Sequence, residues 1–161
     1  MLKLVVCISG KGSNLKALLE AEREGALRMH IVGVVSNRPE AAGLEYAQAH
    51  DVPIAVLSPG NYPSRDAYDR ALEQIWTSWC ADYVALAGFM RLLGADLVTR
   101  WEKKIVNIHP SLLPEFKGQY ALRDALALGA TRTGCTVHWV TPEMDSGPIL
   151  GQQEVAIYPE D

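Results

Sequence analysis

The chain has 161 residues, of which 48% are hydrophobic and 21% are charged, and its formal net charge is -4. This length predicts a single domain with a core large enough to fold without disulfides or structural metals. The negative charge argues against a nucleic-acid partner, which usually requires a basic face. No apolar run approaches the roughly 20 residues of a membrane span, and the first residues, MLKLVVCISG, show no cleavable signal.

The three cysteines, Cys7, Cys80 and Cys135, are odd in number and far apart, and none of them forms a C-x-x-C pair. We therefore expect reduced thiols without a redox or metal-binding role. This use of cysteine is typical of a cytoplasmic protein.

Short apolar runs alternate with helical patterns along the chain. Strands are predicted at residues 2–9, 30–37, 52–57, 82–88 and 104–109, and helices between them at 15–25, 41–50 and 64–80. Two further strands, 133–140 and 148–157, are expected to run antiparallel at one side. The repeated β-α-β-α order predicts an α/β fold with a doubly wound, mostly parallel sheet flanked by helices.

The helix at 64–80 has the clearest pattern, with an apolar stripe that is expected to pack in the core: Leu72, Ile75, Trp76 and Trp79. At the end of the chain, AIYPED resembles a strand followed by the start of a helix, with Pro159 and two acids suited to a first turn. No helix follows, so we expect a final C-terminal helix to be missing.

Sheets of this kind bind ligands beyond the carboxyl ends of their strands. Three polar stretches are predicted at such ends: GKGSN (10–14), GFMR (88–91) and NIHPS (107–111). We therefore expect the functional residues among these three stretches.

The first stretch, SGKGSN, matches neither common nucleotide motif. Leu15 occupies the third glycine position of a dinucleotide fingerprint, and the second strand ends at Ser36-Asn37-Arg38 without the expected acid. No G-K-[ST] closes a Walker loop. A glycine turn before a helix suits a single phosphate group, held by backbone N–H groups and the helix dipole. The alternative is a tight turn in which Ser13 or Asn14 caps the helix.

Asn107 and His109 lie two residues apart at a strand end, so their side chains are expected on one face while Ile108 points away. Pro110 favours an extended backbone at His109. An amide beside an imidazole can stabilise an oxyanion and move a proton, which indicates acyl transfer.

Asp145 lies in the loop TPEMDSGPIL, just before the last strand. If the fold brings Asp145 beside His109, the carboxylate would favour the protonated imidazole and raise its pKa. The other histidines, His30, His50 and His138, have no comparable setting, and we expect structural roles for them.

Five segments in this order and spacing resemble the glycinamide ribonucleotide transformylase (phosphoribosylglycinamide formyltransferase) family: SGKGSN, SRDAYDRAL, LAGFMRLL, NIHPSLLPEFKG and VHWVTPEMDSGPIL. NIHPSLLP with the later D-x-G-P loop is specific for the wider formyltransferase superfamily, and GSN for its purine-pathway branch. The resemblance covers essentially the whole chain. It implies one Rossmann-like formyltransferase domain over residues 1–161, without its final helix.

The resemblance also implies an activity, namely transfer of a formyl group from 10-formyltetrahydrofolate to the primary amine of glycinamide ribonucleotide in de novo purine biosynthesis. The implied catalytic residues are Asn107, His109 and Asp145. Residues that would bind the phosphate and ribosyl part are Gly12, Ser13 and Asn14. Residues that would bind the folate are Arg65, Met90, Arg91, Leu92, Leu93 and Asn107. The implied partners are small molecules only, without metal, nucleic acid or membrane, and the chain would be a monomer or weak homodimer.

The chain departs from the family pattern at Tyr120, where the family usually has a histidine. The alternatives are a formyltetrahydrofolate hydrolase, which normally carries an additional N-terminal domain, and a non-catalytic nucleotide-binding module, which would leave Asn107 and His109 without a purpose. A methionyl-tRNA formyltransferase would need a basic surface and a further C-terminal domain. A nicotinamide-dependent dehydrogenase is excluded by Leu15 and by the end of the second strand.

Overall fold

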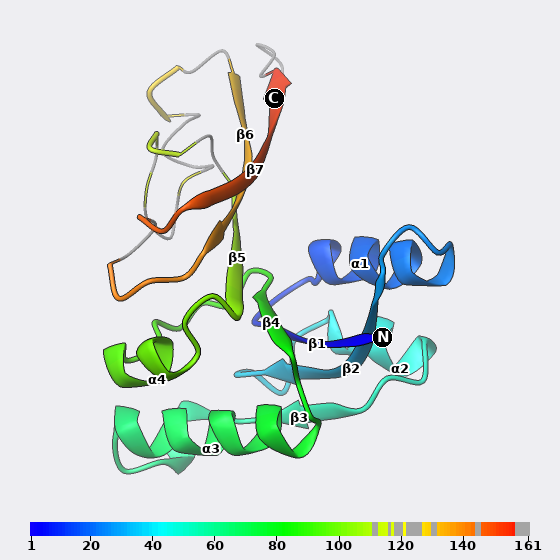
Figure 1. Cartoon of the computed structure of the whole chain (residues 1–161), viewed down its shortest axis with the longest axis vertical. Coiled ribbons are helices and arrows are strands. Elements are labelled where there is room, and N and C mark those ends of the chain that lie inside the picture. Colours follow the sequence, from blue (N-terminus) through cyan, green and yellow to red (C-terminus); the bar gives the residue numbers. More distant parts are fainter. Residues whose placement is uncertain are drawn as a thin grey trace.

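The fold is a mixed sheet with helices on both faces, seen here in a computed structural model (Figure 1). The structure describes residues 1–110, 113–115, 117, 121, 127–129, 132–143 and 146–156. Within these residues the sheet has seven strands in the order β3-β2-β1-β4-β5-β6-β7. The strands are β1 (Leu2–Ile8), β2 (Met29–Ser36), β3 (Ile54–Val56), β4 (Tyr83–Leu86), β5 (Ile105–His109), β6 (Arg132–Trp139) and β7 (Ile149–Ala156).

Strands β1 to β5 pair in parallel, while β6 and β7 pair antiparallel at one side. The predicted fold class is therefore confirmed, including the antiparallel strands at the C-terminal side. The described helices are α1 (Ser13–Arg23), α2 (Leu44–Ala49), α3 (Arg65–Ser78) and α4 (Ala95–Arg100), with a 3-10 turn, η1 (Pro59–Asn61). None of these helices is long and apolar enough to cross a membrane.

Two helices differ from the sequence prediction. Helix α2 begins later than expected, because the N–H of Gly43 donates to the carbonyl of Gly10 (3.0 Å) and holds the preceding residues in a turn. Helix α4 was not predicted at all. It has six residues and buries only Leu97 and Val98, which is too short for a helical period to show in the sequence.

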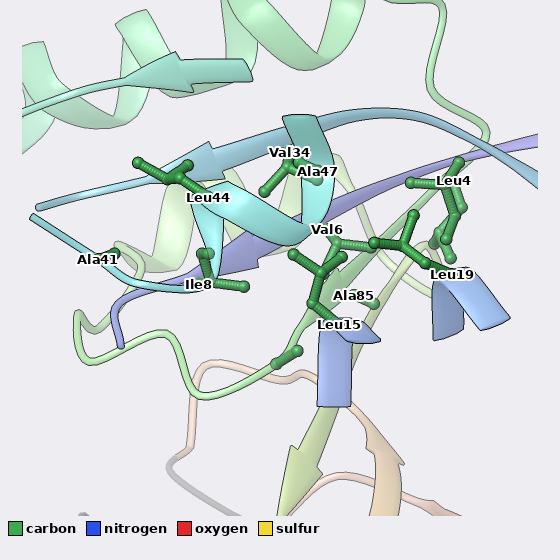
Figure 2. Packing of buried hydrophobic residues seen from close by; sticks show 12 residues of the cluster. Leu4, Val6, Ile8, Leu15, Leu19, Val34, Ala41, Leu44, Ala47 and Ala85 are labelled. Atoms are coloured by element: carbon green, nitrogen blue, oxygen red, sulfur yellow. The ribbon is translucent and has the colours of Figure 1, made fainter. Parts of the chain in front are cut away.

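The core lies on both faces of the sheet, because successive residues of β1 point to opposite sides. Leu4, Val6 and Ile8 pack beneath α1 and α2 in the first cluster (Figure 2). Val5 and Cys7 belong to the second cluster, under α3 and α4. Burial on both faces explains why the first strand reads as a continuous apolar run.

Helix α3 contributes its largest buried side chains to the second cluster, namely Tyr68, Leu72 and Trp76. Its predicted stripe is confirmed, since Leu72 and Trp76 are fully buried and Ile75 and Trp79 pack against the same cluster. Ser64 caps the helix by accepting a hydrogen bond from the N–H of Ala67 (3.1 Å). The N-terminus of α3 is thereby placed beside the carboxyl ends of the parallel strands, where a ligand site is expected.

The three cysteines are free. Cys7 is fully buried in β1, and this burial raises the pKa of its thiol to about 12. Its sulfur is therefore protonated at neutral pH and a poor nucleophile. The expected start of a final helix at Pro159 lies outside the described residues.

Candidate active site

A cavity of about 530 Å³ opens at the carboxyl ends of β4 and β5. Its wall combines the first residue of α3, the loop between β4 and α4, the end of β5 and the segment after β6. The lining residues on which the site depends are Arg65, Met90, Arg91, Leu92, Leu93, Asn107 and His109. The structure therefore brings together two of the three predicted catalytic residues and the whole set predicted to bind folate.

The alternation of β5 places Asn107 and His109 on the cavity side. Ile105 belongs to the second core cluster, whereas Val106 and Ile108 pack against the first. Asn107 and His109 therefore share the face of Ile105, as their spacing predicts. His109 is 4% exposed and Asn107 is half-buried.

A third polar side chain, His138, contacts Asn107. It lies opposite Asn107 in the β5–β6 register, is 2% exposed, and has its Nε2 atom 3.3 Å from Nδ2 of Asn107. Its Nδ1 atom lies 2.9 Å from the carbonyl oxygen of Trp139. A carbonyl oxygen only accepts, so Nδ1 carries the proton and Nε2 accepts from the Asn107 amide.

The sequence indicated only a structural setting for His138, and the antiparallel pairing of β6 puts this side chain against Asn107. His30 and His50 do not line this cavity. His30 Nδ1 lies 2.6 Å from the Glu22 carboxylate, and His50 Nδ1 lies 2.9 Å from the carbonyl of Tyr46. No local pattern marks His138, since the pairing that gives it its role joins residues 31 positions apart.

The segment after His109 is held against the antiparallel strands. The N–H of Leu113 donates to Oγ1 of Thr136 (3.1 Å), and the amide of Gln152 donates to the Leu113 carbonyl (3.0 Å). The two contacts fix the polypeptide shortly after Pro110. Asp145 and Tyr120 lie outside the described residues.

The loop before α1 is shaped by two glycines. Gly12 occupies the N-cap position with φ 74°, and a Cβ atom on it would lie 2.6 Å from the Cα of Gly43. The alternative in which Ser13 or Asn14 caps the helix is therefore wrong, since both belong to the first turn and no side chain caps it. Both side chains are exposed, and residues 12–14 do not line the cavity.

Charge is concentrated at the α3 side of the cavity. The guanidinium of Arg91 lies 4.1 Å from the centre of the Tyr68 ring. Burial raises the pKa of Asp69, opposed by a hydrogen bond from the N–H of Gly94 and by the charges of Arg91 and Arg65. The exposed side chains of Met90 and Leu92 add apolar surface, so the cavity offers a cationic end and an apolar wall. In the described part of the chain, no three His, Cys, Asp or Glu side chains come together as a metal site requires.

Comparison with known proteins matches residues 2–161 to the formyl transferase family. The chain belongs to the formyl transferase family. It is 39% identical over 160 residues to the phosphoribosylglycinamide formyltransferase of Escherichia coli, covering 99% of this chain and 76% of that protein. It is 44% identical over 155 residues to the bovine trifunctional purine biosynthetic protein adenosine-3, covering 96% of this chain but only 15% of that longer protein.

The fold agrees with solved members of the family. The crystal structure of glycinamide ribonucleotide transformylase 1 from Symbiobacterium toebii superposes with a TM-score of 0.96 at 43% identity, covering 100% of this chain and 76% of that one. The phosphoribosylglycinamide formyltransferase from Bacillus halodurans superposes with a TM-score of 0.93 at 38% identity, covering 99% of this chain and 82% of that one. The predicted formyltransferase fold is thereby confirmed.

Proposed function

We propose that this formyl transferase moves a formyl group from 10-formyltetrahydrofolate to the primary amine of glycinamide ribonucleotide, a step of de novo purine biosynthesis. The observation that carries the proposal is the joint placement of Asn107 and His109 in one cavity with Arg65 and the 90–93 segment. Relatives that carry the transformylase name at about 40% identity support the same activity.

In the proposed mechanism the amine nitrogen attacks the formyl carbon, and a C–N bond forms as the carbonyl oxygen becomes an oxyanion. The Asn107 amide and the protonated imidazole of His109 would donate hydrogen bonds to this oxyanion. The bond between the formyl carbon and N10 then breaks, and the proton lost by the amine passes to N10. Asp145 would relay this proton and keep His109 protonated.

The contact with His138 supports the role of Asn107. The amide nitrogen of Asn107 has two N–H groups, and one of them is directed to Nε2 of His138. The second N–H is left for the oxyanion, with the amide plane already fixed. A preorganised donor of this kind stabilises a transition state without reorganising during the reaction.

The two substrates would occupy separate parts of the site. Arg65 and Arg91 suit the carboxylates of a folate, and backbone groups near Leu92 and Leu93 suit its pterin. Backbone N–H groups of residues 12–14, at the start of an 11-residue helix, suit the single phosphate of the ribonucleotide. The proposal includes one formyltransferase domain over residues 1–161, a cytoplasmic location and a monomer or weak homodimer.

The test is a spectrophotometric assay that follows 10-formyltetrahydrofolate with and without glycinamide ribonucleotide. Cofactor loss that depends on the ribonucleotide supports the proposal. Loss to water alone indicates a formyltetrahydrofolate hydrolase, and ribonucleotide binding without cofactor loss indicates a nucleotide-binding module. Either result contradicts the proposed transfer.

Replacing Asn107 tests the mechanism itself. Asn107→Ala should lower kcat by about 10²–10³-fold, because one oxyanion donor is lost. Thermal unfolding should show a folded variant with stability lower by about 1–3 kcal/mol, because the buried Nε2 of His138 loses its donor. The matched control is Asn61→Ala, at an exposed turn outside the cavity, which should keep normal turnover. Turnover near that of the wild type in Asn107→Ala would refute the role assigned to Asn107.

A further inference from the structure

The cofactor loop, defined as residues 90–94, is anchored at both ends by buried side chains from other elements. We propose that Ser9 and Asp69 are positioning residues that hold this loop in the shape that binds the folate. The inference rests on the proposed function, because it assigns the loop to the cofactor. The hydrogen bonds that define the two anchors join Ser9 to Asn37 and Met90, and Asp69 to Gly94.

The first anchor is Ser9, which follows β1 and is 3% exposed. The N–H of Met90 donates to Oγ of Ser9 (2.7 Å), and this hydroxyl lies 2.6 Å from Oδ1 of Asn37. A carbonyl oxygen only accepts, so the single hydroxyl proton points to Asn37 and the lone pairs face Met90. One directed chain of hydrogen bonds thus joins the ends of β2 and β1 to the start of the cofactor loop.

The second anchor is Asp69 of α3, which is 4% exposed. Its Oδ2 atom accepts a hydrogen bond from the N–H of Gly94 (2.8 Å), at the other end of the loop. A Cβ atom at Gly94 would lie 2.7 Å from the same oxygen, so a side chain there would displace the Asp69 carboxyl group from this contact. Burying a carboxylate is costly, and Oδ1 of Asp69 has no partner among the described residues.

Between the anchors, the loop keeps its own hydrogen-bonding groups available. Within the described residues, the N–H groups of Arg91, Leu92 and Leu93 have no hydrogen-bond partner. All three residues line the cavity. The loop is therefore fixed at its two ends and offers unpaired donors in its middle, which is the arrangement of a preorganised binding segment.

Loss of an anchor should weaken cofactor binding without slowing the chemical step. A looser loop must be ordered when the cofactor binds, and this cost falls equally on the ground state and the transition state. The KM for 10-formyltetrahydrofolate should rise, while kcat depends on Asn107 and His109 and should be retained. A merely structural role would lower the amount of folded protein and leave both constants unchanged.

The first variant is Ser9→Ala, with Ser36→Ala as its matched control. Ser36 is also fully buried at the carboxyl end of a strand, and its hydroxyl also makes one donated and one accepted hydrogen bond, both to Arg38 (2.7 and 3.0 Å). Ser9→Ala should raise the folate KM about tenfold, the effect of one hydrogen bond, with kcat and the ribonucleotide KM within about twofold. Ser36→Ala should leave the folate KM unchanged.

The second pair tests the other anchor. Asp69→Asn keeps an oxygen that can accept from Gly94 and should retain a folate KM close to that of the wild type. Asp69→Ala removes the acceptor and should raise the folate KM about tenfold. If Ser9→Ala does not fold, this pair decides the inference by itself.

Amide hydrogen exchange gives a readout that does not depend on activity. In the wild-type chain the amides of Met90 and Gly94 should be protected, and those of residues 91–93 should exchange fast. Ser9→Ala should remove the protection of Met90 and leave that of Gly94.

A wild-type chain without turnover refutes the proposed function, and the exchange pattern then decides whether the anchors exist. An unchanged folate KM in both anchor variants, or an equal rise in Ser36→Ala, overturns the inference.

Discussion

The contact between Asn107 and His138 shows how a single residue acquires its orientation. An asparagine amide alone has two rotations of similar energy, and crystal or solvent contacts choose between them. In this chain the unprotonated Nε2 atom of the buried His138 selects one orientation of the Asn107 amide. The His138 ring is itself fixed by the carbonyl of Trp139. The orientation of the Asn107 amide therefore depends on the tautomer of His138, which is not among the residues that line the cavity.

His138→Phe tests this dependence. The ring volume is kept, but the acceptor for the Asn107 amide is lost, so kcat should fall at least about tenfold while both KM values change little. Steady-state kinetics measure the effect. His50→Phe is the control, because the Nδ1 atom of His50 also lies 2.9 Å from a main-chain carbonyl, that of Tyr46, and His50 does not line the cavity. An equal loss of kcat in both variants would mean that His138 has no special link to Asn107.

At the scale of elements, the start of α1 depends on close packing between two loops. Gly12 adopts a left-handed conformation and touches Gly43, whose own Cβ would lie 2.7 Å from the side chain of Ile8. Two backbones can approach this closely only where neither carries a side chain. The exposed first turn of α1 is therefore held in place by the turn before α2 and not by a capping side chain.

A comparison of Gly12→Ala with Gly25→Ala should separate the stability cost of backbone strain from the stability cost of a steric clash. Gly25 has a similar φ of 78° but no neighbour within 4 Å, so Gly25→Ala should cost about 1 kcal/mol of unfolding free energy. Gly12→Ala adds the clash with Gly43 and should cost about 3 kcal/mol or more. Urea unfolding measures both values. Equal costs would show that the Gly12–Gly43 contact relaxes freely.

At the scale of the whole molecule, two carboxylates of α3 should affect stability with opposite pH dependence. Arg100 and Trp101 donate hydrogen bonds to Glu73 and lower its pKa, with the Arg100 contact as the largest cause. Burial raises the pKa of Asp69. Where folding lowers a pKa, the resulting stabilisation is present above the pKa of the unfolded chain and is lost as pH falls. Where folding raises a pKa, the stabilisation is present at acid pH and is lost as pH rises.

The free energy of unfolding should therefore respond differently in two variants. Glu73→Gln should be less stable than the wild type by about 1 kcal/mol at pH 7, since Arg100 is half-exposed, and this gap should close as pH falls below about 4. Asp69→Asn should gain stability relative to the wild type as pH rises from about 4 towards 7. Urea unfolding across this range checks both, and parallel pH profiles for the two variants would contradict the assigned causes.

Strands β1, β2 and β4 could be predicted because most of their residues are buried on both faces and read as apolar runs. Helix α4 could not be predicted, because six residues are too few to show a helical repeat of apolar side chains. In the site, Asn107 and His109 could be predicted as a pair, since two positions along one strand always share a face. The contact of His138 with Asn107 could not be predicted, because only the pairing of β5 with β6 brings the two residues together.

Three features follow from local sequence: the succession of most strands and helices along the chain, the strand ends that carry polar groups, and the common face of Asn107 and His109. These features depend on local periodicity and on glycine and proline, which act over a few residues. Which strand ends meet is set by the packing of the folded chain. Ser9 reaches Met90 across 81 positions, and Asp69 reaches Gly94 across 25. Such contacts follow from strand order and helix packing, which are set by burial of the whole core and leave no mark at either residue alone.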